Sequence, residues 1–100
     1  MMLEIPLSSG APHFSQEHEI LGRHYTIECE WIEREGYWVL HLFNDQEEPI
    51  ALGLRVTAGF PIFCDRHLGL GLMLTTKNPN VELNVTNLHR DFGLVAYALV

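Results

Sequence analysis

Histidine is the residue type that first suggests chemistry in this sequence. Six are spread along the chain, at His13, His18, His24, His41, His67 and His89. A zinc site needs three or four ligands that converge at about 2 Å, and local pairs such as HxH, CxxC or HExxH usually supply part of the set. None of these pairs occurs, and Cys64-x-x-His67 is the nearest approach. The spacing therefore favours surface or interface histidines, which could make an interface sensitive to pH, over a bound metal.

Glu28 and Glu30 are the carboxylates best spaced for paired acid–base work, because they stand two apart on one predicted strand. Glu28 would lie opposite His41 in the predicted hairpin. General acid–base catalysis needs such groups in a dry pocket with perturbed pKa values. The same side of the strand also carries His24 and Thr26, so we interpret it as a solvated face.

Possible nucleophiles lack the partners that would activate them. Ser8, Ser9 and Cys64 have no recognisable base or nucleophile elbow around them. Gly69-x-Gly71 is not followed by the Lys-Ser/Thr of a phosphate loop. We therefore predict no catalytic residues, no cofactor and no metal, and hence a protein that is not an enzyme.

Composition and charge limit the remaining possibilities. The 100 residues suffice for one domain spanning residues 1–100, and 47% hydrophobic with 19% charged residues is ordinary for a globular protein. The formal net charge of −7 repels phosphate backbones, so it argues against sequence-specific nucleic-acid binding and favours a basic partner or channel wall. No apolar run reaches the ~18 residues that would cross a membrane. Cys29 and Cys64 are predicted to be free thiols of a protein made in a reducing cytoplasm, because no secretory signal is visible.

The central element is a predicted β-hairpin from Arg23 to Asn44. Apolar residues alternate with polar ones along both arms, around a four-residue loop that ends in Gly36. This loop pairs Trp31 with Trp38. The same register pairs Ile32 with Tyr37, Cys29 with Leu40 and Ile27 with Leu42. A slip by one residue would place Trp38 beside Glu30, away from Trp31, so the register is well specified.

Further strands extend this hairpin on both sides. The segment from His13 to Leu21 is predicted to join it through a type II′ turn at Gly22-Arg23. That turn sets Ile20 opposite Tyr25, His18 opposite Ile27, Gln16 opposite Cys29 and Phe14 opposite Trp31. After an acidic turn at 45–49, a strand from Ile50 to Ala58 completes a four-stranded meander. Its predicted alternation puts Ile50, Leu52, Leu54 and Val56 on one side.

The two ends of the chain supply the remaining strands. Leu3 to Leu7 contains Pro6, so it belongs at a sheet edge or ends there. In the second half we predict strands at Ile62–Cys64, Leu68–Thr76, Val81–Val85 and Phe92–Val100, and a short helical turn at 86–91 capped by Thr86 or Asn87. About seven strands must close or stack, so the predicted fold is all-β, a single small antiparallel β-sandwich or partly open β-barrel.

Apolar residues on the outward sides of two strands are the candidate protein-interface residues. They are Tyr37, Val39 and Phe43 on the hairpin and Val95, Tyr97 and Leu99 on the last strand. Exposed aromatics more often mark a protein interface than a catalytic site, although a second layer of the same domain could equally cover the hairpin residues. An alternative function is a small ligand-binding β-barrel. In that case Trp31, Trp38, Tyr25 and Phe14 would line a pocket instead of a core.

Five segments, taken in order, resemble a known protein family. They are Ile5-Pro6-Leu7-Ser8, Leu21–Tyr25, Trp31–Trp38, Pro49–Val56 and Phe92–Tyr97. Their order and spacing resemble the baseplate plug family of contractile-tailed bacteriophages and prophages. The resemblance covers most of the chain and is best between Leu21 and Val56, whereas the segment from Phe63 to Asn87 departs more.

The resemblance implies a structural virion protein and no catalytic residues. Members of the family look like small β-domains at the centre of the baseplate, near the mouth of the tail tube. For this chain it implies partners among the baseplate hub and spike or the tail-tube proteins, assembly as a homo-oligomer, synthesis in the host cytoplasm and a final place in the virion tail baseplate. The acidic charge suits a plug in a tube through which DNA must pass without sticking.

Overall fold

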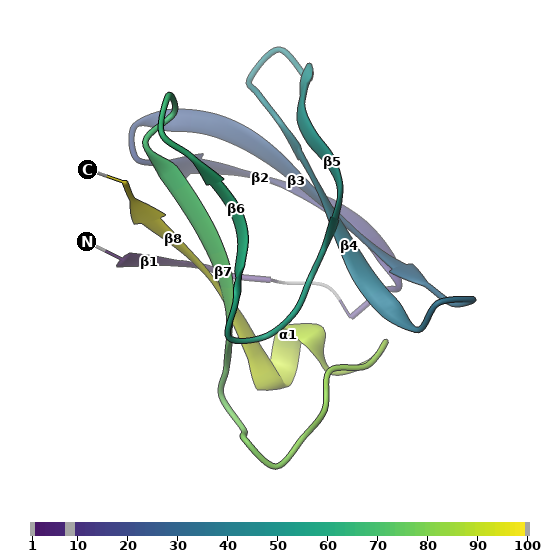
Figure 1. Ribbon diagram of the computed structural model, residues 1–100. Helices are drawn as coiled ribbons and strands as arrows, with labels where there is room; N and C mark the ends of the chain where they lie inside the picture. The colour runs from purple at the N-terminus through teal and green to yellow at the C-terminus, as the bar shows by residue number, and fades with distance from the viewer. Residues whose placement is uncertain (1, 8–9, 100) are drawn as a thin grey trace.

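Two stacked antiparallel sheets make up the structure (Figure 1). The computed structural model describes residues 2–7 and 10–99, which form eight strands and one short helix. Sheet A has the strand order β1-β8-β7-β6 and consists of β1 (Met2–Ile5), β6 (Pro61–Asp65), β7 (Leu70–Thr76) and β8 (Phe92–Ala98). Sheet B has the order β2-β3-β4-β5 and consists of β2 (His13–Ile20), β3 (Arg23–Ile32), β4 (Tyr37–Phe43) and β5 (Pro49–Arg55). The predicted all-β sandwich is confirmed, and neither sheet closes into a barrel within these residues.

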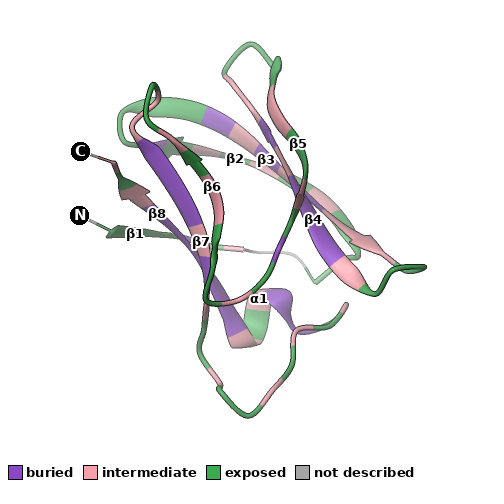
Figure 2. Ribbon diagram, viewed as in Figure 1, coloured by how far each residue is buried: buried purple, intermediate pink, exposed green. Residues whose placement is uncertain are grey.

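The core lies between the inner faces of the two sheets. Figure 2 shows burial concentrated on β3 and β4 in sheet B and on β7 and β8 in sheet A. The apolar side chains exposed by 1% or less are Ile20, Ile27, Trp38, Leu40 and Leu42 from sheet B and Leu70, Leu72, Leu74, Leu94 and Ala96 from sheet A. Within the described residues, no helix is long and apolar enough to cross a membrane.

The β3–β4 hairpin has the predicted register. Trp31 lies opposite Trp38, and the other three predicted pairs are also present. Gly36 has φ 74°, a left-handed conformation that glycine adopts without steric cost. The two indoles meet edge to face, with ring centroids 5.8 Å apart and an interplanar angle of 68°. This geometry is favourable for an aromatic pair beyond the area that it buries.

The β2–β3 turn is one residue earlier than predicted. It consists of Leu21 and Gly22, with φ 52° and 85°, which is the requirement of a type I′ turn rather than type II′. The predicted pairs of this ladder are therefore wrong. Ile20 pairs with Arg23, His18 with Tyr25, Gln16 with Ile27 and Phe14 with Cys29. Moving the turn by one residue shifts the pairing of β2 with β3 by two residues. Because side chains alternate with a period of two, every side chain of β2 keeps its predicted face.

The alternation predicted for residues 50–58 is confirmed at Ile50, Leu54 and Val56, which pack in or against the core, but it is wrong at Leu52. The pairing of β4 with β5 contains register shifts on either side of Leu42, and Gly53 has φ 69°. A bulge of this kind bends a strand and leaves a residue outside the ladder. Leu52 is consequently 60% exposed, although the sequence places it on the core side.

The segment before the helix is irregular and not the strand predicted at 81–85. The amide of Asn87, only 1% exposed, holds this segment in place. Its Oδ1 accepts a hydrogen bond from the Asn84 N–H at 2.8 Å, and its Nδ2 donates to the Glu82 carbonyl at 2.7 Å. A backbone whose polar groups bond to a side chain in this way cannot also join a ladder.

The predicted helical turn is α1 (Leu88–Asp91). Asn87 occupies the N-cap position, as predicted, but its side chain makes no capping hydrogen bond. β1 lies at the edge of sheet A and ends before Pro6, as its proline requires. Ser8, Ser9 and Val100 lie outside the described residues.

The two tryptophans should differ in their contribution to stability. Trp38 is 1% exposed and donates its indole N–H to the Asn84 carbonyl at 2.9 Å, whereas Trp31 is partly exposed. Trp38→Ala should lower the free energy of unfolding by about 3–5 kcal/mol, because it leaves a cavity and an unpaired carbonyl. Trp31→Ala should cost about half as much or less. Urea unfolding followed by circular dichroism measures both, and equal losses would contradict this placement of the indoles.

Candidate protein-contact surfaces

The outer face of sheet B holds three of the predicted interface residues. Tyr37 and Phe43 are partly exposed there, and Val39 between them is 8% exposed. Arg55 stands opposite Val39 and extends over the Tyr37 ring, with its guanidinium carbon 4.4 Å from the ring centroid. This distance is within the range of a cation–π interaction. The outward side of the hairpin is therefore partly covered by its own neighbours and not by sheet A.

Three histidine–glutamate pairs lie on the same outer face. They are His13 with Glu28, His24 with Glu19 at 3.8 Å, and His41 with Glu30 at 3.4 Å. Glu28 stands opposite His41 in the ladder, as predicted, yet its carboxylate contacts His13 on the neighbouring strand. His41 likewise reaches diagonally to Glu30. The sequence predicted a solvated face here but not these contacts. Their signal is the recurrence of His and Glu at outward positions of β2, β3 and β4.

Hydrogen bonds orient two of these imidazoles, those of His13 and His41. The Glu28 carboxylate raises the pKa of His13 mainly through their hydrogen bond, with a further electrostatic contribution from Glu30. His41 accepts a hydrogen bond at Nδ1 from the Gly53 N–H at 2.9 Å, so a neutral His41 carries its proton on Nε2, the atom that faces Glu30. The bulge of β5 is thus fastened to the imidazole of β4.

The outer face of sheet A holds two of the other three predicted residues. Val95 lies between Glu4 and Met73 on the neighbouring strands and is 7% exposed. Tyr97 is partly exposed on the same face. Leu99 follows β8, and its N–H donates to the Gly69 carbonyl at 2.9 Å.

The Tyr97 ring lies over Gly71, in the space that a side chain at this position would occupy. A Cβ atom at position 71 would stand 2.3 Å from the ring, so only glycine fits beneath it. The phenol reaches the edge strand β6, where its oxygen is 3.4 Å from the Cys64 sulfur, and this hydrogen bond raises the pKa of Tyr97. Burial raises the pKa of the other thiol, Cys29, to about 12, so that thiol is inert.

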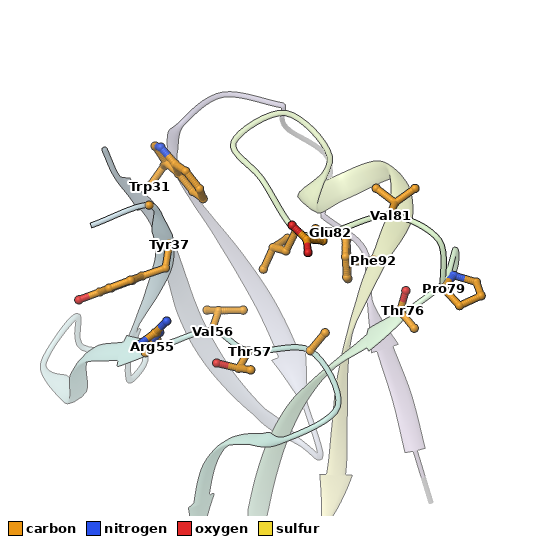
Figure 3. Close-up of a pocket in the computed structure, with 13 residues that line it drawn as sticks. Trp31, Tyr37, Arg55, Val56, Thr57, Thr76, Pro79, Val81, Glu82 and Phe92 are labelled. Carbon is orange, nitrogen blue, oxygen red and sulfur yellow. The ribbon is translucent and has the colours of Figure 1, made fainter. Parts of the chain in front are cut away.

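The four aromatic residues of the ligand-binding alternative do not line one pocket. A pocket of about 450 Å³ lies between Trp31 and the 79–83 segment (Figure 3). Tyr25 borders a separate pocket of about 490 Å³. Trp38 is buried in the core, with the Phe14 ring packed against it at a centroid distance of 6.0 Å.

The structure therefore divides five of the six predicted interface residues between two surfaces, and Leu99 follows the end of β8. Tyr37, Val39 and Phe43 face outward from sheet B, whereas Val95 and Tyr97 face outward from sheet A, on the opposite side of the sandwich. Across the part of the chain that the structure describes, no three His, Cys, Asp or Glu side chains are grouped so that they could hold a metal ion.

Comparison with known proteins decides the family. Residues 2–98 match the family described as cyanophage baseplate Pam3 plug gp18. The chain belongs to this baseplate plug family. Membership confirms the resemblance inferred from the sequence, and it makes this chain a structural protein of the bacteriophage baseplate. No curated protein sequence matches the chain.

A double-mutant cycle tests the packing on the outer face of sheet A. Gly71→Ala should lower the free energy of unfolding by about 1–3 kcal/mol, because the new methyl group displaces the Tyr97 ring. Once Tyr97→Ala has removed the ring, the same change should cost much less. Chemical denaturation of the two single variants and the double variant gives the coupling. Additive losses would show that the ring does not occupy this place.

The His13–Glu28 pair should make stability depend on pH. Because the folded-state pKa of His13 is raised, the pair stabilises the fold fully below the unfolded-state pKa of about 6.5 and loses this effect as the pH rises through the folded-state value. The coupling between His13→Gln and Glu28→Gln should therefore be larger at about pH 5.5 than at about pH 8. Urea unfolding of the four proteins of this cycle at both pH values measures it. A coupling that grows with pH would reverse the assigned sign.

Proposed function

We propose that this protein acts without catalysis, as a plug at the centre of a phage or prophage tail baseplate, where it contacts hub and spike or tail-tube proteins. The observation that carries the proposal is the family match across residues 2–98. Assembly as a homo-oligomer belongs to the same proposal, since a small plate at the axis of a symmetric tail must meet several equivalent neighbours. The virion tail is its final location, after synthesis in the host cytoplasm.

The outer faces of the two sheets support a role in contact. Sheet B combines Tyr37 and Phe43 with the buried Val39 on its outer face, and sheet A combines Tyr97 with the buried Val95. Aromatic side chains are enriched at protein interfaces. Phe43 on sheet B and Tyr97 on sheet A are suitable probes of the two faces, because both are partly exposed and they lie on opposite sides of the sandwich. A plate with a contact surface on each side can be held between neighbours.

The charge of the chain supports a place beside passing DNA. The formal net charge is −7, from thirteen acidic and six basic residues. Such a surface repels phosphates and prevents non-specific adhesion of DNA. The same charge favours neighbours with basic surfaces.

Reconstitution tests the proposed partners directly. The chain should be produced alone and together with the hub, spike and tail-tube proteins encoded beside it, and each mixture measured by size-exclusion chromatography with light scattering. We expect a defined complex with at least one of these proteins, and self-association. Monomer alone in every mixture, together with absence of the chain from purified tails, would contradict the proposal.

Point variants test which surfaces make the contacts. Phe43→Ser and Tyr97→Ser should each weaken assembly about tenfold, because each removes an aromatic anchor from one outer face. Phe60→Ser is the matched control, since Phe60 is an aromatic residue that is 65% exposed on a turn outside both faces. Light scattering reports assembly and circular dichroism confirms folding. Loss of assembly only in the Phe60 variant would move the interface to that turn.

A further inference from the structure

The three histidine–glutamate pairs have a property that none of the predicted interface residues has. All six side chains stand on the outer face of sheet B, on three adjacent strands. Half of the histidines of the chain are thus gathered on one face, each within 4 Å of a carboxylate in a different residue. Histidine is the side chain that changes charge between about pH 5 and pH 8.

We propose that the outer face of sheet B is a pH-responsive contact surface, which attracts a basic protein surface at neutral pH and loses that attraction when its three histidines become protonated. The inference deepens the proposed function and rests on it only in that the protein acts through protein contacts. It adds the chemistry of the partner and the condition that governs binding.

The charges on this face define the switch. β2 contributes His13, Glu17 and Glu19, β3 contributes His24, Glu28 and Glu30, β4 contributes His41, and β5 contributes Arg55. With neutral imidazoles, four carboxylates against one guanidinium give the face a formal charge of −3. With three imidazolium ions the formal charge is zero. Each protonated imidazole lies beside a glutamate carboxylate. Its positive charge offsets the negative charge that would otherwise attract a basic partner.

Exposure of the pairs makes the switch accessible from outside. His24 and Glu19 are 69% and 65% exposed, and His13 is 57% exposed beside the more covered Glu28. Protonation of these two histidines therefore needs no opening of the fold. The hydrogen bond to Glu28 raises the pKa of His13.

His41 adds a mechanical effect to the electrostatic one. Its Nδ1 accepts the N–H of Gly53, and an imidazolium ion has no acceptor. Protonation of His41 therefore breaks its bond to the β5 bulge while it strengthens the contact with Glu30. Acid both neutralises the face and loosens its edge at Gly53.

Titration of an oligolysine peptide against the intact protein tests the switch. Isothermal calorimetry at low ionic strength should show binding about tenfold weaker at about pH 5.5 than at about pH 7.5, since the peptide keeps its charge over this range. A variant with His13→Gln, His24→Gln and His41→Gln should bind equally at both pH values. Unchanged pH dependence in that variant would overturn the proposal.

Two matched variants separate the face from the net charge. One replaces Glu17, Glu19, Glu28 and Glu30 by Gln, and the other replaces Glu35, Glu47, Glu48 and Glu82, which are exposed on loops. Both lose four negative charges, but only the first should abolish binding. Equal losses would mean that the peptide senses only overall charge and would overturn the proposed surface. Failure of this test leaves assembly into tails intact, so it is distinguishable from failure of the proposed function.

Nuclear magnetic resonance locates the protonation steps without any partner. The Gly53 amide signal should move with pH together with the signals of the His41 ring. A Gly53 signal that does not follow His41 would overturn the mechanical part of the proposal. Thermal unfolding of every variant confirms that it is folded at both pH values.

Discussion

The burial of one indole joins the separate parts of this structure. Trp38 lies on β4 with the Trp31 ring from β3 and the Phe14 ring from β2 packed against it. Its N–H donates to the carbonyl of Asn84, in the segment that leads into α1 and then β8. A buried indole N–H without a partner would cost about 1–3 kcal/mol, so the core is complete only when this segment supplies a carbonyl. Three strands of sheet B and the approach to sheet A are thereby fixed by one side chain.

Much of the fold can be predicted from the alternation of apolar and polar residues along the strands. The predictions are wrong where a side chain or a turn conformation favours another backbone arrangement. The register of β3 and β4 is predictable because any slip by one residue exposes a tryptophan. The β2–β3 turn is not, because a leucine with positive φ is uncommon and Leu21 adopts it under the constraint of the surrounding sheet. The alternation of apolar residues at 81–85 predicts a strand. The Asn87 amide instead bonds to the backbone of Asn84 and Glu82, and the hydrogen bonds of an amide that is only 1% exposed outweigh a short apolar pattern.

The contact surfaces were predictable only in part, for a related reason. Parity assigns Tyr37, Val39, Phe43, Val95 and Tyr97 to outward faces, and that is where they lie. This alternation does not determine which side chains on neighbouring strands are in contact. Two of the three histidine–glutamate contacts on sheet B run diagonally between strands, so they depend on side-chain length and sheet twist as well as on register. His24 and Glu19 are directly opposite each other in the ladder. The fit of the Tyr97 ring over Gly71 likewise needs the β7–β8 register, which the sequence alone did not supply.

Folding alone does not explain the composition of the outer face of sheet B. The core needs only the inner residues of β2 to β4, and threonine, valine or tyrosine would suit the outer positions of a strand better than glutamate does. Like charges on one face of a sheet are also unfavourable, and Glu28 and Glu30 are successive outward residues of β3. Their histidine partners offset this repulsion electrostatically only when protonated. At neutral pH the face therefore carries an uncompensated cost, and at that pH its carboxylates are available to an approaching basic surface.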